Sequence, residues 1–207
     1  MRFLAVILSL VLCFCLVSCE KSENNQSESQ TMQSMSMQHL SILLEHGISM
    51  MAQGAALKLQ GQAHGDEMLA QSADLLRRAM SGPEMAAMHQ GGQGESPAMQ
   101  HTHDLGAAAF DLLEMMMELK ADRVPKNASM LHHALNMAAQ GAAMKSLAEM
   151  GVSKDIDASM QDHGLQMQQT SMQLYQEISS DTIYSKSVLK VIHLLVSDAP
   201  KAMPHMH

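Results

Sequence analysis

The distribution of apolar and polar residues divides the chain into three parts. Residues 3–17 are almost continuously apolar, and residues 20–36 are polar and show no apolar periodicity. From Met37 onward, Leu, Met and Ala recur among Gln, Glu and Lys, all of which favour helix, while β-branched and aromatic residues are scarce. The third part is therefore predicted to be all-α, with a core of Leu, Met and Ala.

Glycine and proline mark the places where these helices are expected to end. The clearest interior loop is the sequence GGQGESP at residues 91–97, and Gly82-Pro83 is a second candidate break. Asn127 is expected to cap the helix that follows it. This punctuation predicts about six helices, over residues 37–60, 66–89, 101–120, 127–151, 155–178 and 181–196.

An internal repeat relates two of these helices. Residues 44–58 align without a gap on residues 131–145, and nine of the fifteen aligned positions are identical. The identities include His, Met, Gln and Gly, which is more than a shared helical composition explains. The helices that follow match more weakly, with Met68 aligned on Met160.

The repeat predicts two tandem three-helix units, over residues 37–120 and 121–198, that pack as a pseudo-symmetric helical bundle. A four-helix bundle with two accessory helices is the alternative architecture. Residues 199–207, which end in Met-Pro-His-Met-His, are expected to form a loose Met/His tail.

The beginning of the chain has the pattern of an export signal. Arg2 supplies a minimal positive charge, and the apolar run over residues 3–17 is too short to span a bilayer comfortably. The run leads into the sequence LVSC at residues 16–19, which resembles the lipobox of bacterial lipoproteins. The resemblance implies that residues 1–18 are a signal peptide and that a lipid is attached to the sulfur of Cys19.

The residues after this cysteine indicate where the protein is anchored. Glu20 stands where an aspartate would favour retention in the inner membrane of enteric bacteria, so an outer-membrane anchor that faces the periplasm is expected. Residues 19–36 are rich in Ser, Gln and Asn, and we expect them to form a flexible tether between the lipid and the folded domain.

Charge and cysteine content exclude several kinds of partner. The formal net charge is −8 at pH 7, and it becomes about −9 when Arg2 leaves with the signal peptide. No basic patch is available to neutralise phosphates, so nucleic acid is not expected as a partner. Cys13 and Cys15 also leave with the signal, and the single remaining cysteine can form neither a disulfide nor a thiolate metal site within one chain.

Methionine and histidine are the unusual part of the composition, with 23 and 12 residues. Thioether sulfur and imidazole nitrogen are ligands suited to Cu(I) and its soft relatives. His46 and Met50 lie four residues apart, as do His133 and Met137 in the second copy of the repeat, so each pair occupies one helical face. Small residues run beside each pair. They predict that a neighbouring helix approaches closely and that the pair faces this helix rather than solvent.

Two readings of these histidines compete. They are either metal ligands or buried groups that hydrogen-bond to a backbone carbonyl or to the repeat mate. Met160, His163 and Met167 form a further group on one face of the fifth predicted helix. His193 lies in an apolar segment and is expected to be a core histidine. Weaker metal candidates are Met85, Met88, His89, His101, His103, His205 and His207.

With these motifs the chain looks like the Met/His-rich helical proteins of the bacterial periplasm that are associated with copper tolerance. The resemblance is one of composition and architecture. It implies that Cu(I), or Ag(I), is bound for sequestration, storage or delivery, with a metal-transfer or envelope protein as a possible partner. The ligands implied are His46, Met50, His133, Met137, Met160, His163 and Met167.

Two other functions remain open at this point. A helical envelope chaperone or adaptor would use Met-rich faces to bind partner proteins, because methionine surfaces repack readily. A haem-binding bundle with His and Met axial ligands is the third hypothesis, but few aromatic side chains are present to line a porphyrin pocket. The chain has no zinc-protease, phosphate-loop or serine-hydrolase motif, and no enzymatic activity is expected.

Overall fold

A computed structural model of the chain describes residues 37–82, 85–86, 96–120, 125–151, 153–178 and 182–197. The predicted signal peptide, Cys19, the tether and the Met/His tail lie outside the described residues, and so do Met88, His89, His205 and His207.

The described residues form helices and short turns, with no strand among them, so the prediction of an all-α fold is confirmed. A helix over residues 37–59, called the 37–59 helix below, precedes the labelled ones. No helix within the described part of the chain is long and apolar enough to cross a membrane. The labelled helices are α2 (His64–Ser81), α4 (Pro97–Glu118), α5 (Ala128–Glu149), α6 (Lys154–Ile178) and α7 (Ile183–Val196).

Local sequence explains most of the helix boundaries. Ser96 caps α4 by accepting a hydrogen bond from the Met99 backbone N–H at 3.2 Å, and Thr182 caps α7 in the same way. Asn127 precedes α5 but does not cap it. Its side chain instead donates a hydrogen bond to the carbonyl oxygen of Ile178 at 3.1 Å, which ties the start of α5 to the end of α6.

The turns before α2 and α6 each contain a glycine in the left-handed region. Gly61 has φ 72° and Gly151 has φ 71°, a conformation that glycine adopts without the steric cost that a Cβ brings. Gly82 follows the last residue of α2, so the predicted break at Gly82-Pro83 ends this helix earlier than residue 89.

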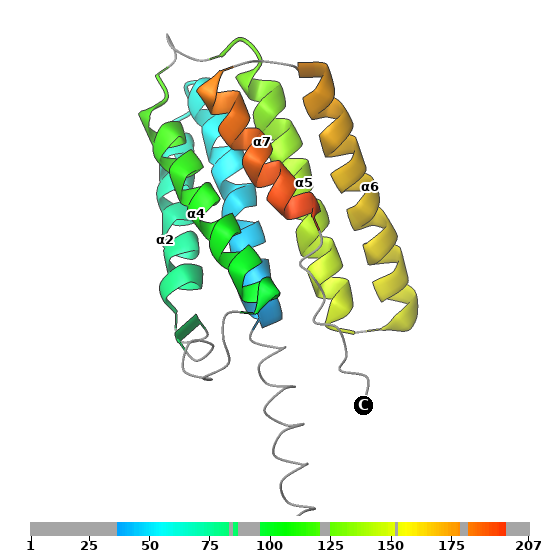
Figure 1. Cartoon of the computed structure of the whole chain (residues 1–207). Helices are drawn as coiled ribbons and strands as arrows, with labels where there is room; N and C mark the ends of the chain where they lie inside the picture. Colours follow the sequence, from blue (N-terminus) through cyan, green and yellow to red (C-terminus); the bar gives the residue numbers. More distant parts are fainter. Residues whose placement is uncertain are drawn as a thin grey trace, which may run out of the picture. The chain divides into compact units, whose positions relative to one another are not determined.

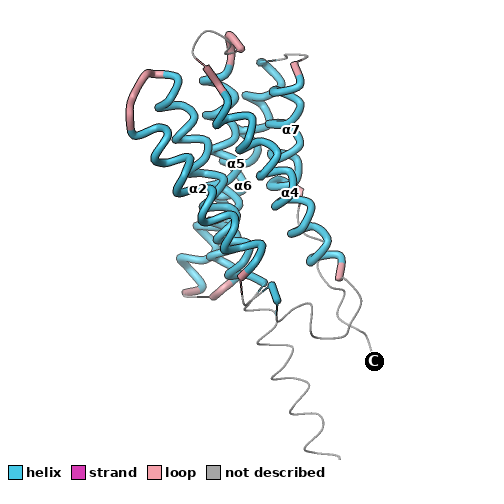
Figure 2. Tube along the Cα trace, turned by 90° about the vertical axis from the view of Figure 1, so that its left-hand side faces the viewer, coloured by secondary structure: helices cyan, strands magenta, loops and turns pink. Residues whose placement is uncertain are grey.

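The helices form two layers, with neighbours in sequence running in opposite directions (Figure 1). The 37–59 helix and α5 lie side by side, α2 and α6 flank them, and α4 and α7 cover one face (Figures 1 and 2). α5 packs against both α6 and α7, and α4 packs against α7 and α2. The face of the 37–59 helix and α5 that points away from α4 and α7 is called the outer face below.

The core between the two layers is built from leucine, alanine and a few methionines, as the composition predicts. Leu44, Leu112 and Leu135 are completely buried, together with Ile192 from α7. The described methionines that are buried in this core are Met51, Met85, Met99 and Met116. Four methionines are thus explained by core packing, and four more, Met37, Met80, Met115 and Met172, are half-buried against the edge of the core. The other described methionines need another explanation.

Helix α6 joins the bundle in a different way, because Ile178 is its one buried hydrophobic residue. Its other buried positions are Gly164, Gln168 and Ser171. Ser171 donates a hydrogen bond to the carbonyl oxygen of Ala134 at 2.7 Å, and Gln168 donates one to that of Leu195 at 2.7 Å. Backbone proximity, these polar contacts and the packing of Met172, Leu174 and Tyr175 against the edge of the core therefore hold this helix in place.

Close glycine contacts join the helices of two helical hairpins. The first hairpin consists of the 37–59 helix and α2, and the second consists of α5 and α6. A Cβ placed on Gly65 would lie 2.8 Å from the carbonyl oxygen of Gly54, and one on Gly164 would lie 2.5 Å from that of Gly141. Real Cβ atoms do not approach other atoms so closely. Gly54 and Gly141 are equivalent positions of the sequence repeat, so the 37–59 helix meets α2 as α5 meets α6.

These contacts correct the weaker part of the repeat alignment. Because Gly65 and Gly164 occupy the same place, the sequence HGDEMLAQS from residue 64 aligns with HGLQMQQTS from residue 163. Met68 therefore corresponds to Met167, and the predicted match to Met160 is wrong. The equivalence of α4 and α7, and with it the tandem three-helix arrangement, stays a prediction.

Gly164→Ala is expected to lower the stability of the protein by about 1–3 kcal/mol, the usual cost of overpacking. At an exposed helical position the same change would stabilise the helix by up to ~1 kcal/mol, so the sign of the effect is diagnostic. Urea unfolding measures it, with Gln169→Ala at an exposed position of α6 as the control. A Gly164→Ala variant more stable than the wild type would show that the close approach is not needed.

Candidate metal site

The two predicted His/Met pairs of the sequence repeat have the same exposure. His46 and His133 are exposed, whereas Met50 and Met137 are half-buried. The expectation that the whole pair faces a neighbouring helix is therefore wrong for the histidines. Each imidazole is open to solvent, and the thioether one turn away lies against the protein surface.

An exposed histidine followed by a half-buried methionine also occurs on α2 and α6, but the sequence analysis predicted only the residues on α6. His64 and His163 are exposed, and Met68 and Met167, four residues later, are half-buried. In each helix the residue after the histidine is a buried glycine. The motif His-[Gly/Ala]-x-x-Met thus occurs on four helices. The pair of His64 and Met68 was missed, although a search for this spacing would have found it.

The methionines of these pairs lie beside the glycine contacts. A Cβ on Gly54 would lie 3.0 Å from the Met68 Cβ, and one on Gly141 would lie 3.1 Å from the Met167 Cβ. Neither methionine belongs to the core or to the half-buried residues packed against it, and the same holds for Met50. We call the line along which the two helices of a hairpin meet its seam. The thioethers therefore line the outer side of each seam, away from α4 and α7.

A polar cluster separates the two seams on the outer face. Asn136 of α5 accepts hydrogen bonds from Ser49 at 2.7 Å, from Gln53 at 3.2 Å and from Gln140 at 3.3 Å. Ser49 and Asn136 are themselves equivalent positions of the sequence repeat. The two hairpins are therefore joined through this polar cluster, with two His/Met pairs in each hairpin.

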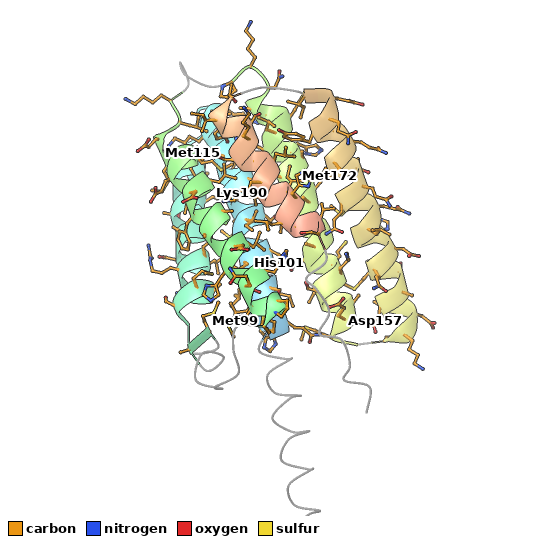
Figure 3. All side chains as sticks on the ribbon, viewed as in Figure 1. Met99, His101, Met115, Asp157, Met172 and Lys190 are labelled. Carbon is orange, nitrogen blue, oxygen red and sulfur yellow. The ribbon has the colours of Figure 1, made fainter. Side chains whose placement is uncertain are left out.

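The weaker metal candidates are placed less favourably for binding an ion at the surface. Met85 and Met99 are buried in the core, so Met85 is not available as a ligand at the surface. His101 and His103 are half-buried on α4. Figure 3 shows Met99 and His101 near the beginning of α4.

The core histidine is His132, whereas the predicted His193 is exposed on α7. The imidazole of His132 is 1% exposed and shares a short hydrogen bond with the Tyr184 hydroxyl, with the two rings edge to face. Burial lowers the pKa of His132 from 6.5 to about 4 and raises that of Tyr184. His132 is therefore neutral at pH 7 and holds α5 to α7.

A buried glutamate lies between the 37–59 helix and α5. Glu45 is 6% exposed and accepts a hydrogen bond from the Ser146 hydroxyl at 2.9 Å. Burial raises its pKa from 4.5 to about 7, and the neighbouring Glu149 adds to this effect, while Ser146 and Lys145 oppose it.

His132 and Glu45 have opposite effects on stability as the pH changes. The stabilising contribution of neutral His132 is present above pH 6.5 and is lost as the pH falls through about 4, because the unfolded chain takes up the proton first. That of neutral Glu45 is present below pH 4.5 and is lost as the pH rises through about 7. The two contributions therefore oppose each other between pH 4.5 and 6.5.

Replacing either His132 or Glu45 should reveal the pH dependence of stability that the other residue causes. In metal-free protein, Glu45→Gln is expected to make stability fall as the pH is lowered from 6.5 to 4.5, and His132→Phe to make it fall as the pH is raised over this range. Each slope is expected to reach up to about 1.4 kcal/mol per pH unit. Urea unfolding at several pH values measures both slopes, and two variants with the same slope would contradict the assignment.

Among the described residues, no three His, Cys, Asp or Glu side chains lie close enough together to hold a metal ion. The donor set of the outer face is instead imidazole and thioether, one helical turn apart. This set fits a soft monovalent ion that accepts two to four ligands better than it fits Mg(II), which needs clustered oxygen ligands.

Comparisons with known proteins do not assign the chain. No protein-family model matches it, and neither a characterised protein nor a solved structure matches it.

Proposed function

We propose that the protein is a lipid-anchored binder of Cu(I) or Ag(I) in the bacterial cell envelope, which sequesters, stores or delivers the ion. The observation that carries the proposal is the fourfold occurrence of His-[Gly/Ala]-x-x-Met, with the histidine exposed and the methionine half-buried in every copy. Core packing does not account for this pattern, because the core takes its methionines from other positions.

The spacing suits two-ligand binding of a soft ion. Side chains four residues apart on a helix are neighbours, with Cβ atoms about 5–6 Å apart, so the imidazole nitrogen and the thioether sulfur of one pair can reach the same ion. The methionine is half-buried and the histidine is exposed to solvent in every pair, and His64 also lies 3.4 Å from a carboxylate oxygen of Glu67. Such a pair needs no thiolate, which suits a chain whose one cysteine after export is the lipid attachment point.

The proposed envelope location rests on the resemblance of the LVSC sequence at residues 16–19 to a lipobox. An export signal places the protein where thiols are oxidised and thioethers persist. The lipid on Cys19 and the polar residues that follow it would hold the His/Met pairs near the membrane without inserting them.

Anaerobic titration with Cu(I) against a competing chromophoric chelator tests this function. The purified mature protein is expected to retain Cu(I) against a chelator of micromolar affinity, to bind Ag(I) as well, and to bind Mg(II) weakly. Zn(II) is the informative competitor, because histidine also binds it. Failure to retain either soft ion would end the metal proposal.

The envelope chaperone is the second function, and specific observations favour it. Several large hydrophobic side chains remain exposed, among them Ile156 at 55% and Leu165 at 46% on α6. Exposed apolar residues of this kind can mark a protein-binding surface. If the mature protein suppressed aggregation of an unfolded client but retained no Cu(I), this function would replace the first.

A further inference from the structure

The two hairpin seams differ in their methionine content at equivalent positions. The sequence repeat aligns Leu43 with Met130 and Leu57 with Met144. The glycine contacts that align α2 with α6 also match Gly61 with Met160. These three differences each add a thioether to the α5–α6 seam. The opposite difference, Met51 aligned with Ala138, lies in the buried core.

As a result, both helices of the α5–α6 hairpin carry the longer motif Met-x-x-His-x-x-x-Met. In α5 it runs from Met130 through His133 to Met137, and in α6 from Met160 through His163 to Met167. Methionines seven residues apart lie on nearly the same face of a helix. Met144 continues the series on α5. The equivalent motifs of the first hairpin lack the leading methionine.

The added methionines are accessible. Met130 is 44% exposed, and Met144 and Met160 are half-buried. None of the three belongs to the hydrophobic core or to its half-buried fringe. A Cβ on Gly164 would lie 3.2 Å from that of Met144, which places this methionine directly beside the glycine contact. The seam therefore carries several partly exposed methionine side chains.

Packing does not explain the choice of methionine at these positions. Leucine has a similar volume, and the first hairpin has the half-buried Leu43 and Leu57 at the equivalent places. What the α5–α6 seam gains from methionine is sulfur, a soft donor that leucine lacks.

We infer that the outer side of the α5–α6 seam is a thioether-rich binding surface for soft monovalent cations, with a larger capacity than the seam of the first hairpin. The inference rests on the proposed function and goes beyond it, because it divides the metal unequally between the two hairpins. The residues that form the surface are Met130, His133, Met137, Met144, Met160, His163 and Met167.

Counting bound Ag(I) ions by native mass spectrometry tests this inference. The triple variant M130L/M144L/M160L of the mature protein is expected to bind fewer ions than the wild type. The double variant L43M/L57M, which gives the first hairpin two of the three added methionines of the second, is expected to bind more. The control triple M80L/M115L/M172L changes half-buried methionines at the edge of the core (Figure 3 labels Met115 and Met172) and is expected to bind as the wild type does.

The outcomes separate this inference from the proposed function. If the wild type binds no Ag(I), the proposed function fails. If the wild type binds Ag(I) but the M130L/M144L/M160L variant binds as many ions, or the control triple loses as many, the unequal division is wrong. Circular dichroism checks that the variants are folded, and the L43M/L57M variant tests the inference by a gain if the triple variant fails to fold. An unchanged ion count in that double variant would overturn it.

Discussion

Replacing the methionine of every His-[Gly/Ala]-x-x-Met pair with leucine is expected to weaken Cu(I) binding by more than tenfold while leaving the helical content nearly unchanged. The substitution deletes the sulfur and conserves side-chain volume, which costs less than about 1.5 kcal/mol even within a core. These methionines lie outside the core, so the cost to stability should be smaller. The quadruple variant is M50L/M68L/M137L/M167L.

The matched control changes the same number of methionines inside the core. M51L/M85L/M99L/M116L is expected to lose some stability and to keep its Cu(I) affinity, because these four side chains are buried. Chelator competition measures the affinity of both proteins, and circular dichroism measures their folding. Equal affinity in the outer-face variant and the wild type would assign the paired methionines to packing alone.

Acid is expected to release part of the bound metal. A histidine must be deprotonated to bind a metal ion, so the affinity should fall as the solution is acidified. Thioethers do not titrate. We therefore expect a biphasic release of Ag(I), with one fraction lost on acidification and a second, held by methionine alone, retained.

Histidine variants identify the acid-sensitive fraction. In the variant H46Q/H64Q/H133Q/H163Q the fraction lost on acidification should disappear, and the acid-resistant fraction should remain. Equilibrium dialysis of Ag(I) between pH 8 and 5 measures both. A wild-type affinity that does not change over this range would remove these histidines from the set of ligands.

The helices and the two duplicated pairs could be predicted because their signals are local. Glycine and proline mark the helix ends, and a histidine and a methionine four residues apart share a face whatever the helix packs against. The exposure of the histidines could not be predicted in this way. It depends on which neighbours cover each face, and adjacent positions such as His132 and His133 point in directions about 100° apart.

The pair on α2 was missed because of an error of seven residues in the alignment of the second helices. A shift of seven residues turns a helix by only about 20°, so Met68 matches Met160 almost as well as Met167 in its apolar pattern. The contact of Gly65 with Gly54, and of Gly164 with Gly141, fixes the register. That information lies in the packing of two helices and is absent from the pattern of either one.

X-ray absorption at the copper edge of the Cu(I)-loaded mature protein tests the central claim most directly, because it identifies the atoms bound to the metal. Binding by His/Met pairs predicts a first shell that contains both sulfur and nitrogen, with the sulfur contribution reduced in M50L/M68L/M137L/M167L. A first shell of nitrogen or oxygen without sulfur would contradict the account.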